Sequence, residues 1–456
     1  MIKTKSNRYI ENKYNFETEK NILDCDKLTN LIKNNFIYSL NYQLKNSPPN
    51  SKLSRLSDNN EEDDFSIYTG TGGNIYSFWR IYINSLRSEQ NFLDSPSVYL
   101  GHFKKALEVN LSLVEKDKYF PSLSFFMGHP GIYTMACLYG KETNNDLFFK
   151  DNYSKILKMK ELLYHKESEY EVLYGNSGYL YCLLLINKEC RSIFDIMNIN
   201  ETIYEVVKHL HKIGCTYRDK FKTKCLVFPW PKKEVKYLSE IYLGAAHGIF
   251  GALYMMMRAI SQLSEIKPKF IDDIVIKELD LISKDIKSSL DYIITIQFST
   301  GNFPADLEPN IKYSEDNKLH FCHGATGAMI VLTAAYQFYN DDSYLKSAIK
   351  TGEDIWRRGL LLKGNGVCHG IVGNAYALYN LYRVTNDEGF KNKFYCFLLA
   401  TFDEEIQKEC RELVDPQRLS KGVSDHPYSL MEGNAGLLCI YSDFLGDNVS
   451  FPGFEL

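Results

Sequence analysis

Two copies of a Cys-His-Gly triplet carry the residues in this chain that are best suited to chemistry. They are Cys322-His323-Gly324 and Cys368-His369-Gly370, and an apolar run follows each of them. Two thiolates and one imidazole make a Cys₂His zinc set, in which the fourth position stays open for water or substrate. Thiolate ligands favour zinc over magnesium or calcium. Four candidate ligands compete for three or four positions, so the spacing predicts a zinc site without selecting its members.

A buried cysteine is more often a small hydrophobic side chain than a metal ligand. That alternative suits either cysteine alone, whereas two triplets in the same register favour a metal site. We interpret the remaining cysteines as structural, reduced thiols because they lie in helical or polar runs without such partners. They are Cys25, Cys137, Cys182, Cys190, Cys215, Cys225, Cys396, Cys410 and Cys439.

Two further histidines are candidates for acid–base chemistry. His247 closes the segment GAAH in front of Gly248, in register with the Cys-His turns, and His129 lies within GHPG. A histidine at a pocket rim is a suitable general acid or base, because its pKa lies near the operating pH. A hydrogen-bonded structural role is the alternative, and the register favours function for His247 more than for His129.

Charged residues also flank the last two glycine turns. Lys363 precedes Cys368 in KGNGVCHG and is suited to hold a carboxylate, although a solvated lysine is the plain alternative. Asp425 and Glu432 lie in SDHPYSLMEG, and Glu432 directly precedes Gly433, where it could face the same pocket. For both acids, a solvated or helix-capping role is the favoured interpretation.

The elements that must position these side chains belong to a repeat. Gly-x-x-Gly occurs at Gly70/Gly73, Gly128/Gly131, Gly175/Gly178, Gly248/Gly251, Gly324/Gly327, Gly370/Gly373 and Gly433/Gly436. With 28 glycines in 456 residues, chance would give about two such pairs, so the spacing indicates a repeat architecture. Glycine suits the turn into a helix, where backbones approach closely.

The runs after the glycine pairs, such as AMIVLTAAYQFY and NAYALYNLYRV, are apolar nearly all round, as in buried helices. Amphipathic stretches alternate with them, at 102–116, 155–167, 201–213 and 271–296. The pattern predicts an all-α fold, an α/α toroid of seven inner and seven outer helices. We expect a polar arm, a first outer helix and an acidic loop over 1–65, and a single toroid domain over 66–456.

Composition excludes several classes of protein. The net charge is −4, which gives no basic footprint for nucleic acid. There is no apolar N-terminal core and no run of eighteen apolar residues, so we predict no signal peptide and no transmembrane helix. We expect a cytoplasmic monomer, and peripheral membrane association stays open.

Several motifs together resemble the eukaryotic LanC-like proteins, relatives of the bacterial lanthionine cyclases. They are YTG-x-x-G (68–73), LYG-x-x-GY (173–179), GAAHG (244–248), CHGATG (322–327), KG-x-G-x-CHG-x-x-GNAY (363–376), SL-x-EG-x-AG (429–436) and the terminal FPGFEL. The resemblance covers the chain from about residue 66, and the family's fold is an α/α toroid.

The resemblance implies that zinc is bound by Cys322, Cys368 and His369, with His323 beside the metal as a pocket residue. Similar proteins bind glutathione with its thiol at the zinc and add it to dehydroalanine and dehydrobutyrine in damaged proteins. The resemblance further suggests His247 as the acid or base, with Lys363 and Asp425 near the ends of glutathione. The chain has Asn176, and Gly422 and Val423, where some relatives carry arginines.

The resulting hypothesis is a zinc-dependent transferase that forms a thioether, with His247 or His323 supplying the proton to the α-carbon. One alternative is a non-catalytic scaffold that binds glutathione and zinc and contacts signalling proteins, which the changed arginines favour. A glycosidase on an α/α toroid is a weaker alternative, because it needs two catalytic carboxylates and only Asp425 and Glu432 are near.

Overall fold

The chain is described by a computed structural model over residues 8–14, 25–52, 64–117, 122–192, 196, 198–231, 235–265, 273–307, 316, 318–412, 424 and 426–456. Each Gly-x-x-Gly pair lies at the start of an α-helix. These seven helices are α3 (Gly72–Arg87), α5 (His129–Glu142), α7 (Asn176–Cys190), α9 (Ile249–Ser264), α11 (Ala325–Tyr339), α13 (Ile371–Thr385) and α16 (Asn434–Leu445).

Seven other helices alternate with this set. They are α2 (Cys25–Asn46), α4 (Pro96–Lys116), α6 (Asp146–Lys158), α8 (Ile199–Phe221), α10 (Asp273–Ile294), α12 (Asp342–Arg358) and α14 (Glu388–Ala400). The described segments also hold α15 (Glu404–Glu412) and three short 3₁₀ helices, η1 (Glu89–Asn91), η2 (Met159–Tyr164) and η3 (Leu238–Glu240). No β-strand occurs in these segments, and the all-α fold class is confirmed.

Burial distinguishes the two sets of helices, as the sequence predicts. In α9, 12 of 16 residues are buried, so no face of this helix is left for solvent. In α8, only seven of 23 residues are buried, and they recur at three- and four-residue steps along one side. None of the described helices is long and apolar enough to cross a membrane.

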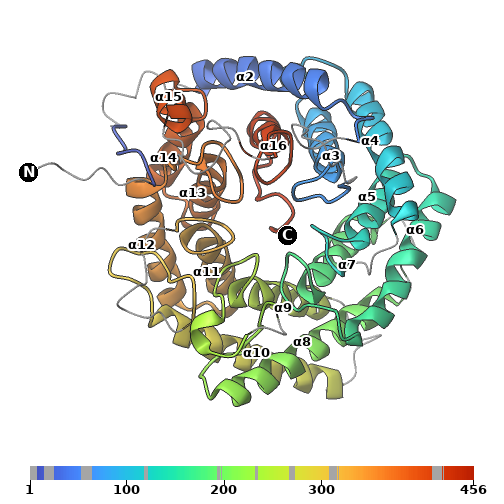
Figure 1. Ribbon diagram of the computed structural model, residues 1–456, viewed down its shortest axis with the longest axis vertical. Helices are drawn as coiled ribbons and strands as arrows, with labels where there is room; N and C mark the ends of the chain where they lie inside the picture. The colour runs from blue at the N-terminus through green and yellow to red at the C-terminus, as the bar shows by residue number, and fades with distance from the viewer. Residues whose placement is uncertain are drawn as a thin grey trace, which may run out of the picture. The chain divides into compact units, whose positions relative to one another are not determined.

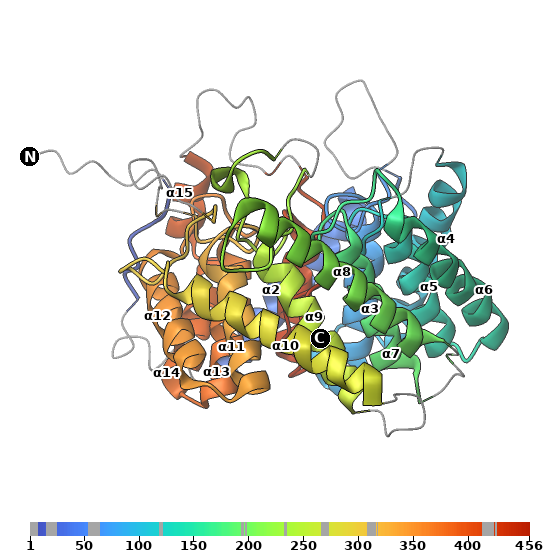
Figure 2. The ribbon, with the colours of Figure 1, turned by 90° about the horizontal axis from the view of Figure 1, so that it is seen from below.

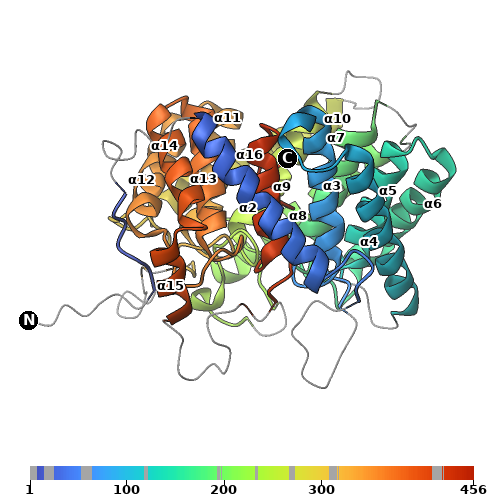
Figure 3. The ribbon, with the colours of Figure 1, turned by 90° about the horizontal axis from the view of Figure 1, so that it is seen from above.

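Two compact units make up the chain. The first contains 1–117, 319–321 and 351–455, and the second contains 118–318, 322–350 and Leu456. In the first unit, α3 packs on α4, α13 packs on α14, and the last helix α16 packs on both α2 and α3. Figures 1 and 3 show α2 running across α16, although the two helices lie at opposite ends of the sequence. The single domain expected over 66–456 stays a prediction.

The second unit repeats the same pairing of helices. Here α5 packs on α6, α7 on α8, and α9 on both α8 and α10. Figure 2 shows α8 and α10 side by side along the edge of this unit. Five of the helices that begin at a glycine pair, α3, α5, α7, α9 and α13, thus each pack on the helix that follows in the chain.

The glycines are required by close backbone contacts in the turns. A Cβ atom at Gly373 would lie 1.9 Å from the carbonyl oxygen of Val367, six residues earlier, and one at Gly436 would lie 2.1 Å from that of Leu430. Gly324 adds a positive φ of 96°, a conformation that L-residues rarely adopt. The chain therefore folds back tightly just before each buried helix.

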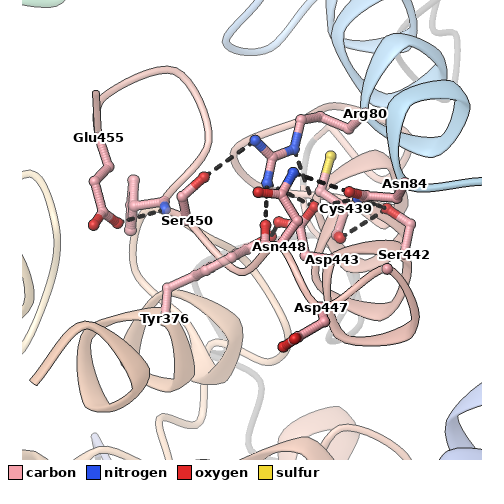
Figure 4. A network of polar contacts seen from close by, with 12 residues as sticks. Arg80, Asn84, Tyr376, Cys439, Ser442, Asp443, Asp447, Asn448, Ser450 and Glu455 are labelled. Carbon is pink, nitrogen blue, oxygen red and sulfur yellow. Dashed lines mark hydrogen bonds and ion pairs between the residues drawn. The ribbon is translucent and has the colours of Figure 1, made fainter. Parts of the chain in front are cut away.

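A buried ion pair joins α3 to α16 in the first unit. The Asp443 carboxylate accepts hydrogen bonds from Arg80 Nε at 3.0 Å, Asn84 Nδ2 at 2.7 Å and the Tyr376 hydroxyl at 2.8 Å. Arg80 also donates to Ser450 Oγ at 3.1 Å, as Figure 4 shows. Every charged atom of the pair is thus satisfied inside the protein, which is the condition for a stable buried pair.

We predict that Asp443→Asn lowers the free energy of unfolding by about 3–5 kcal/mol, because the Arg80 charge is then buried without its partner. Urea titration measures this change. The matched control is Asp447→Asn at the end of the same helix, where the side chain is exposed and the expected change is within about 0.5 kcal/mol. Equal stabilities of the two variants would show that the pair is dispensable.

Candidate functional site

Backbone hydrogen bonds join the turns that precede the buried helices, and they connect equivalent positions of the repeats. In the first unit, Phe321 N donates to Cys368 O at 2.7 Å, Cys368 N to Met431 O at 2.8 Å, and Met431 N to Tyr68 O at 3.1 Å. Cys368, Met431 and Tyr68 each stand two residues before the first glycine of their repeat. Equivalent positions of successive repeats are therefore held side by side.

Cys368 lies at the centre of this array. Its side chain is 2% exposed, and its sulfur accepts a hydrogen bond from the Tyr68 hydroxyl at 2.6 Å. A donor at this distance stabilises a thiolate more than a thiol. His369 follows directly and is partly exposed in front of α13. The turn therefore presents a thiol and an imidazole next to each other, with a phenol that favours the anionic form of the sulfur.

Cys322 belongs to the second unit but follows Phe321 directly in the chain. The side chain of Cys322 is buried, with 9% exposed. Its carbonyl oxygen would lie 1.6 Å from a Cβ at Gly244, so the turn of GAAHG packs directly on the turn of Cys322.

Of the other residues predicted for the site, the structure describes Lys363, Glu432 and His129. Lys363 is exposed in the loop that leads to Cys368. Glu432 accepts a hydrogen bond from Ser424 Oγ at 3.3 Å and precedes α16. Asp425 lies outside the described residues. His129 is the first residue of α5, where its ring meets the edge of the Tyr133 ring with centroids 6.4 Å apart.

A row of four rings lies in the second unit. Tyr174 stacks on Trp230 with ring centroids 5.5 Å apart, Trp230 stacks on His247 at 4.0 Å, and His247 stacks on His323 at 5.7 Å. Tyr174, His247 and His323 come from the turns before α7, α9 and α11, three successive repeats. The structure therefore brings His247 and His323 together, at the register that the sequence indicates.

Burial sets the charge of both histidines. It lowers the pKa of His247 to about 4. Burial is also the main reason that the pKa of His323 is lowered to about 3, and the neighbouring His247 ring contributes to the same shift. Both imidazoles are thus neutral near pH 7, and neither is an imidazolium donor by itself.

A buried carboxyl group stands behind His247. Glu171 is fully buried, and its Oε2 lies 3.6 Å from His247 Nδ1. Burial raises the pKa of Glu171 well above its usual range, against the opposing effect of hydrogen bonds from the backbone N–H groups of Leu173 and Tyr174. Burial therefore favours the protonated form of Glu171, which lies 3.6 Å from the His247 ring nitrogen.

Three members of this arrangement were not predicted from the sequence: Glu171, Trp230 and Tyr68. Glu171 precedes the motif LYG-x-x-GY in the polar stretch HKESEYEV, where nothing distinguishes it from the neighbouring acids. Tyr68 opens the quoted YTG-x-x-G motif, but the first repeat has no Cys or His to draw attention to it. Trp230 comes from the irregular segment after α8, where no repeat predicts its place.

The chain is similar to known proteins in its sequence and in its fold. The chain is 29% identical over 289 residues to "Glutathione S-transferase LANCL1" of Danio rerio, which is 63% of this chain and 62% of that protein's length. It is 26% identical to "LanC-like protein GCL1" of Arabidopsis thaliana, over 73% of this chain and 70% of that protein. The fold is similar to that of nisin cyclase, with a TM-score of 0.56 at 14% identity over 94% of each chain.

The matching segment extends over the whole repeat region. Residues 61–456 fit the family described as "Lanthionine synthetase C-like protein", which includes all seven glycine pairs and both Cys-His turns. The chain therefore belongs to the lanthionine synthetase C-like family.

Proposed function

We propose that this protein adds glutathione to dehydroalanine or dehydrobutyrine residues in proteins or peptides, forming a thioether in a zinc-dependent reaction. The family and the name of the zebrafish relative, a glutathione S-transferase, support a transferase-type or cyclase-type role. The observation that carries the proposal is the stacking of His247 on His323, the residue after Cys322, with the buried acid Glu171 next to His247.

We infer that Cys322, Cys368 and His369 hold the zinc ion. Each offers one ligand atom, and together they give the Cys₂His set of an open catalytic site. The hydrogen bond from Phe321 to Cys368 and the phenol on the Cys368 sulfur support this assignment. Zinc, when bound, would stabilise the thiolate form of the glutathione sulfur at neutral pH. Lys363 and Asp425 are the residues proposed to hold the charged ends of glutathione.

Thiol addition moves one proton. The sulfur forms a bond to the β-carbon, the double-bond electrons move to the α-carbon and its carbonyl, and the α-carbon then takes a proton. We assign this proton to His247 Nε2, with Glu171 replacing it through His247 Nδ1. The proton released from the thiol restores Glu171, so the cycle balances. His323 stacks on His247 and holds the ring in place or serves as an alternative donor.

The experiment that tests the proposal follows the mass of a dehydroalanine peptide incubated with glutathione and zinc-loaded protein. A gain equal to one glutathione, formed faster than without protein, is the expected result. Zinc that is lost in Cys368→Ala, together with bound glutathione but no mass gain, would instead establish the non-catalytic scaffold. Absence of zinc from freshly reduced protein would overturn the metal assignment.

A further inference from the structure

We propose a second zinc site on the outer face of the second unit, formed by His211 and Cys215 of α8 with Asp285 of α10. His211 Nε2 lies 2.7 Å from Asp285 Oδ2 and 3.4 Å from Cys215 Sγ, and Cys215 Sγ lies 3.7 Å from the same Asp285 oxygen. One atom of each residue thus converges on one point, and the cluster shares no residue with the Cys-His turns.

Helical spacing brings these side chains together. His211 and Cys215 are four residues apart and lie on the same face of α8. That face meets α10 along an acidic stripe, because Lys208 pairs with Glu278 at 3.1 Å one turn earlier and Arg218 pairs with Asp285 at 3.4 Å one turn later. The three ligands therefore come from two helices that lie side by side (Figure 2) and are joined by side-chain pairs on both sides of the cluster.

The ligand distances fit a tetrahedral zinc ion. Zinc bonds of about 2.0–2.3 Å to nitrogen, oxygen and sulfur place neighbouring ligand atoms about 3.3–3.6 Å apart. The distances of 3.4 and 3.7 Å to Cys215 Sγ already match, and the 2.7 Å hydrogen bond between His211 and Asp285 has to lengthen by about 0.6 Å. That change is within the reach of side-chain torsions and needs no movement of either helix.

The charges of the proposed ligands also fit a zinc ion. A Cys215 thiolate and the Asp285 carboxylate together balance the two positive charges of zinc. Arg218 bonds the second Asp285 oxygen, Oδ1, and leaves Oδ2 for the metal, while its own charge is matched by Asp219 at 3.1 Å. Such a bond from an outer residue orients a carboxylate ligand. Binding releases the Cys215 thiol proton and breaks the His211–Asp285 hydrogen bond.

Partial exposure leaves the fourth position open. The side chains of His211 and Asp285 are 23% and 35% exposed, so water can reach the ion and complete its coordination. The combination of one thiolate, one imidazole and one carboxylate favours zinc over magnesium or calcium. The site would join α8 to α10 and would be loaded from solvent.

The test compares Cys215→Ser with Cys225→Ser in the full chain. Both exchange one sulfur for oxygen in the same unit, but Cys225 is a buried residue outside α8 and α10, and its sulfur lies 3.8 Å from the Thr223 hydroxyl. Each protein is stripped with a chelator, dialysed against zinc and analysed for metal. We expect Cys215→Ser to hold one equivalent less than Cys225→Ser, and His211→Gln to behave like Cys215→Ser.

The number of zinc equivalents per chain distinguishes this site from the proposed catalytic site. The Cys368→Ala variant should keep the zinc equivalent that the Cys215→Ser variant loses, whether or not the Cys-His turns bind zinc. Cobalt bound to Cys368→Ala should show the near-ultraviolet absorption of a thiolate ligand, and adding Cys215→Ser should abolish it. Equal zinc contents for Cys215→Ser and Cys225→Ser would overturn the proposal and leave the cluster as a hydrogen-bonded contact.

Discussion

Cys368→Ala should bind one zinc equivalent fewer than the wild-type chain and should add glutathione to a dehydroalanine peptide no faster than the uncatalysed reaction. Cys368 is 2% exposed and supplies the sulfur that Tyr68 hydrogen-bonds at 2.6 Å. Removing one of three protein ligands leaves two, too few to hold zinc in a site that keeps its fourth position open. Without the ion, a thiol with a pKa of about 8.5 is mostly protonated at pH 7 and a poor nucleophile.

The control for this variant is Cys396→Ala in α14. Cys396 is fully buried like Cys368, but it lies within a helix rather than in a glycine turn. Its loss should cost stability through the cavity that it leaves while zinc content and thiol addition stay unchanged. A full complement of zinc in Cys368→Ala would refute the ligand assignment, and retained thiol addition without zinc would refute the metal dependence.

The spacing of glycines was enough to place all seven buried helices. The reason is physical: a Cβ at the second glycine, as at Gly373 or Gly436, would overlap a carbonyl oxygen six residues earlier, so the turn admits no larger residue. A constraint of that kind is local and is written in the sequence. The same register placed His247 beside His323, because both precede the first glycine of their turn by one residue.

The glycine spacing could not predict contacts made by residues that differ from one repeat to the next. Tyr68 occupies the position equivalent to Cys368, and only the fold shows that its hydroxyl reaches the sulfur. Trp230 comes from an irregular segment and packs on His247 at 4.0 Å. Glu171 depends on burial for its chemistry, and a single acid in a sequence carries no sign of whether its carboxyl group is solvated or enclosed.

The same dependence on burial determines the expected behaviour of the proton donor. Burial lowers the pKa of His247 to about 4 and raises the pKa of Glu171, so burial favours a neutral imidazole and a protonated carboxyl group. The two groups lie 3.6 Å apart, so a small side-chain movement brings them within hydrogen-bond distance. The carboxyl group donates only while it is protonated, so kcat should fall as the pH rises through the raised pKa of Glu171.

His247→Gln should therefore lower kcat by about 10²–10⁴-fold, the usual contribution of a positioned general acid, while zinc content stays at the wild-type value. Glu171→Gln keeps the size of the side chain but cannot release a proton, so kcat should drop and the alkaline fall in rate should disappear. His129→Gln is the matched control, because His129 also opens a glycine-turn helix but lies outside the stack of rings. Unchanged kcat in His247→Gln, with zinc retained, would assign the proton transfer to another group, and an unchanged pH profile in Glu171→Gln would separate that carboxyl group from catalysis.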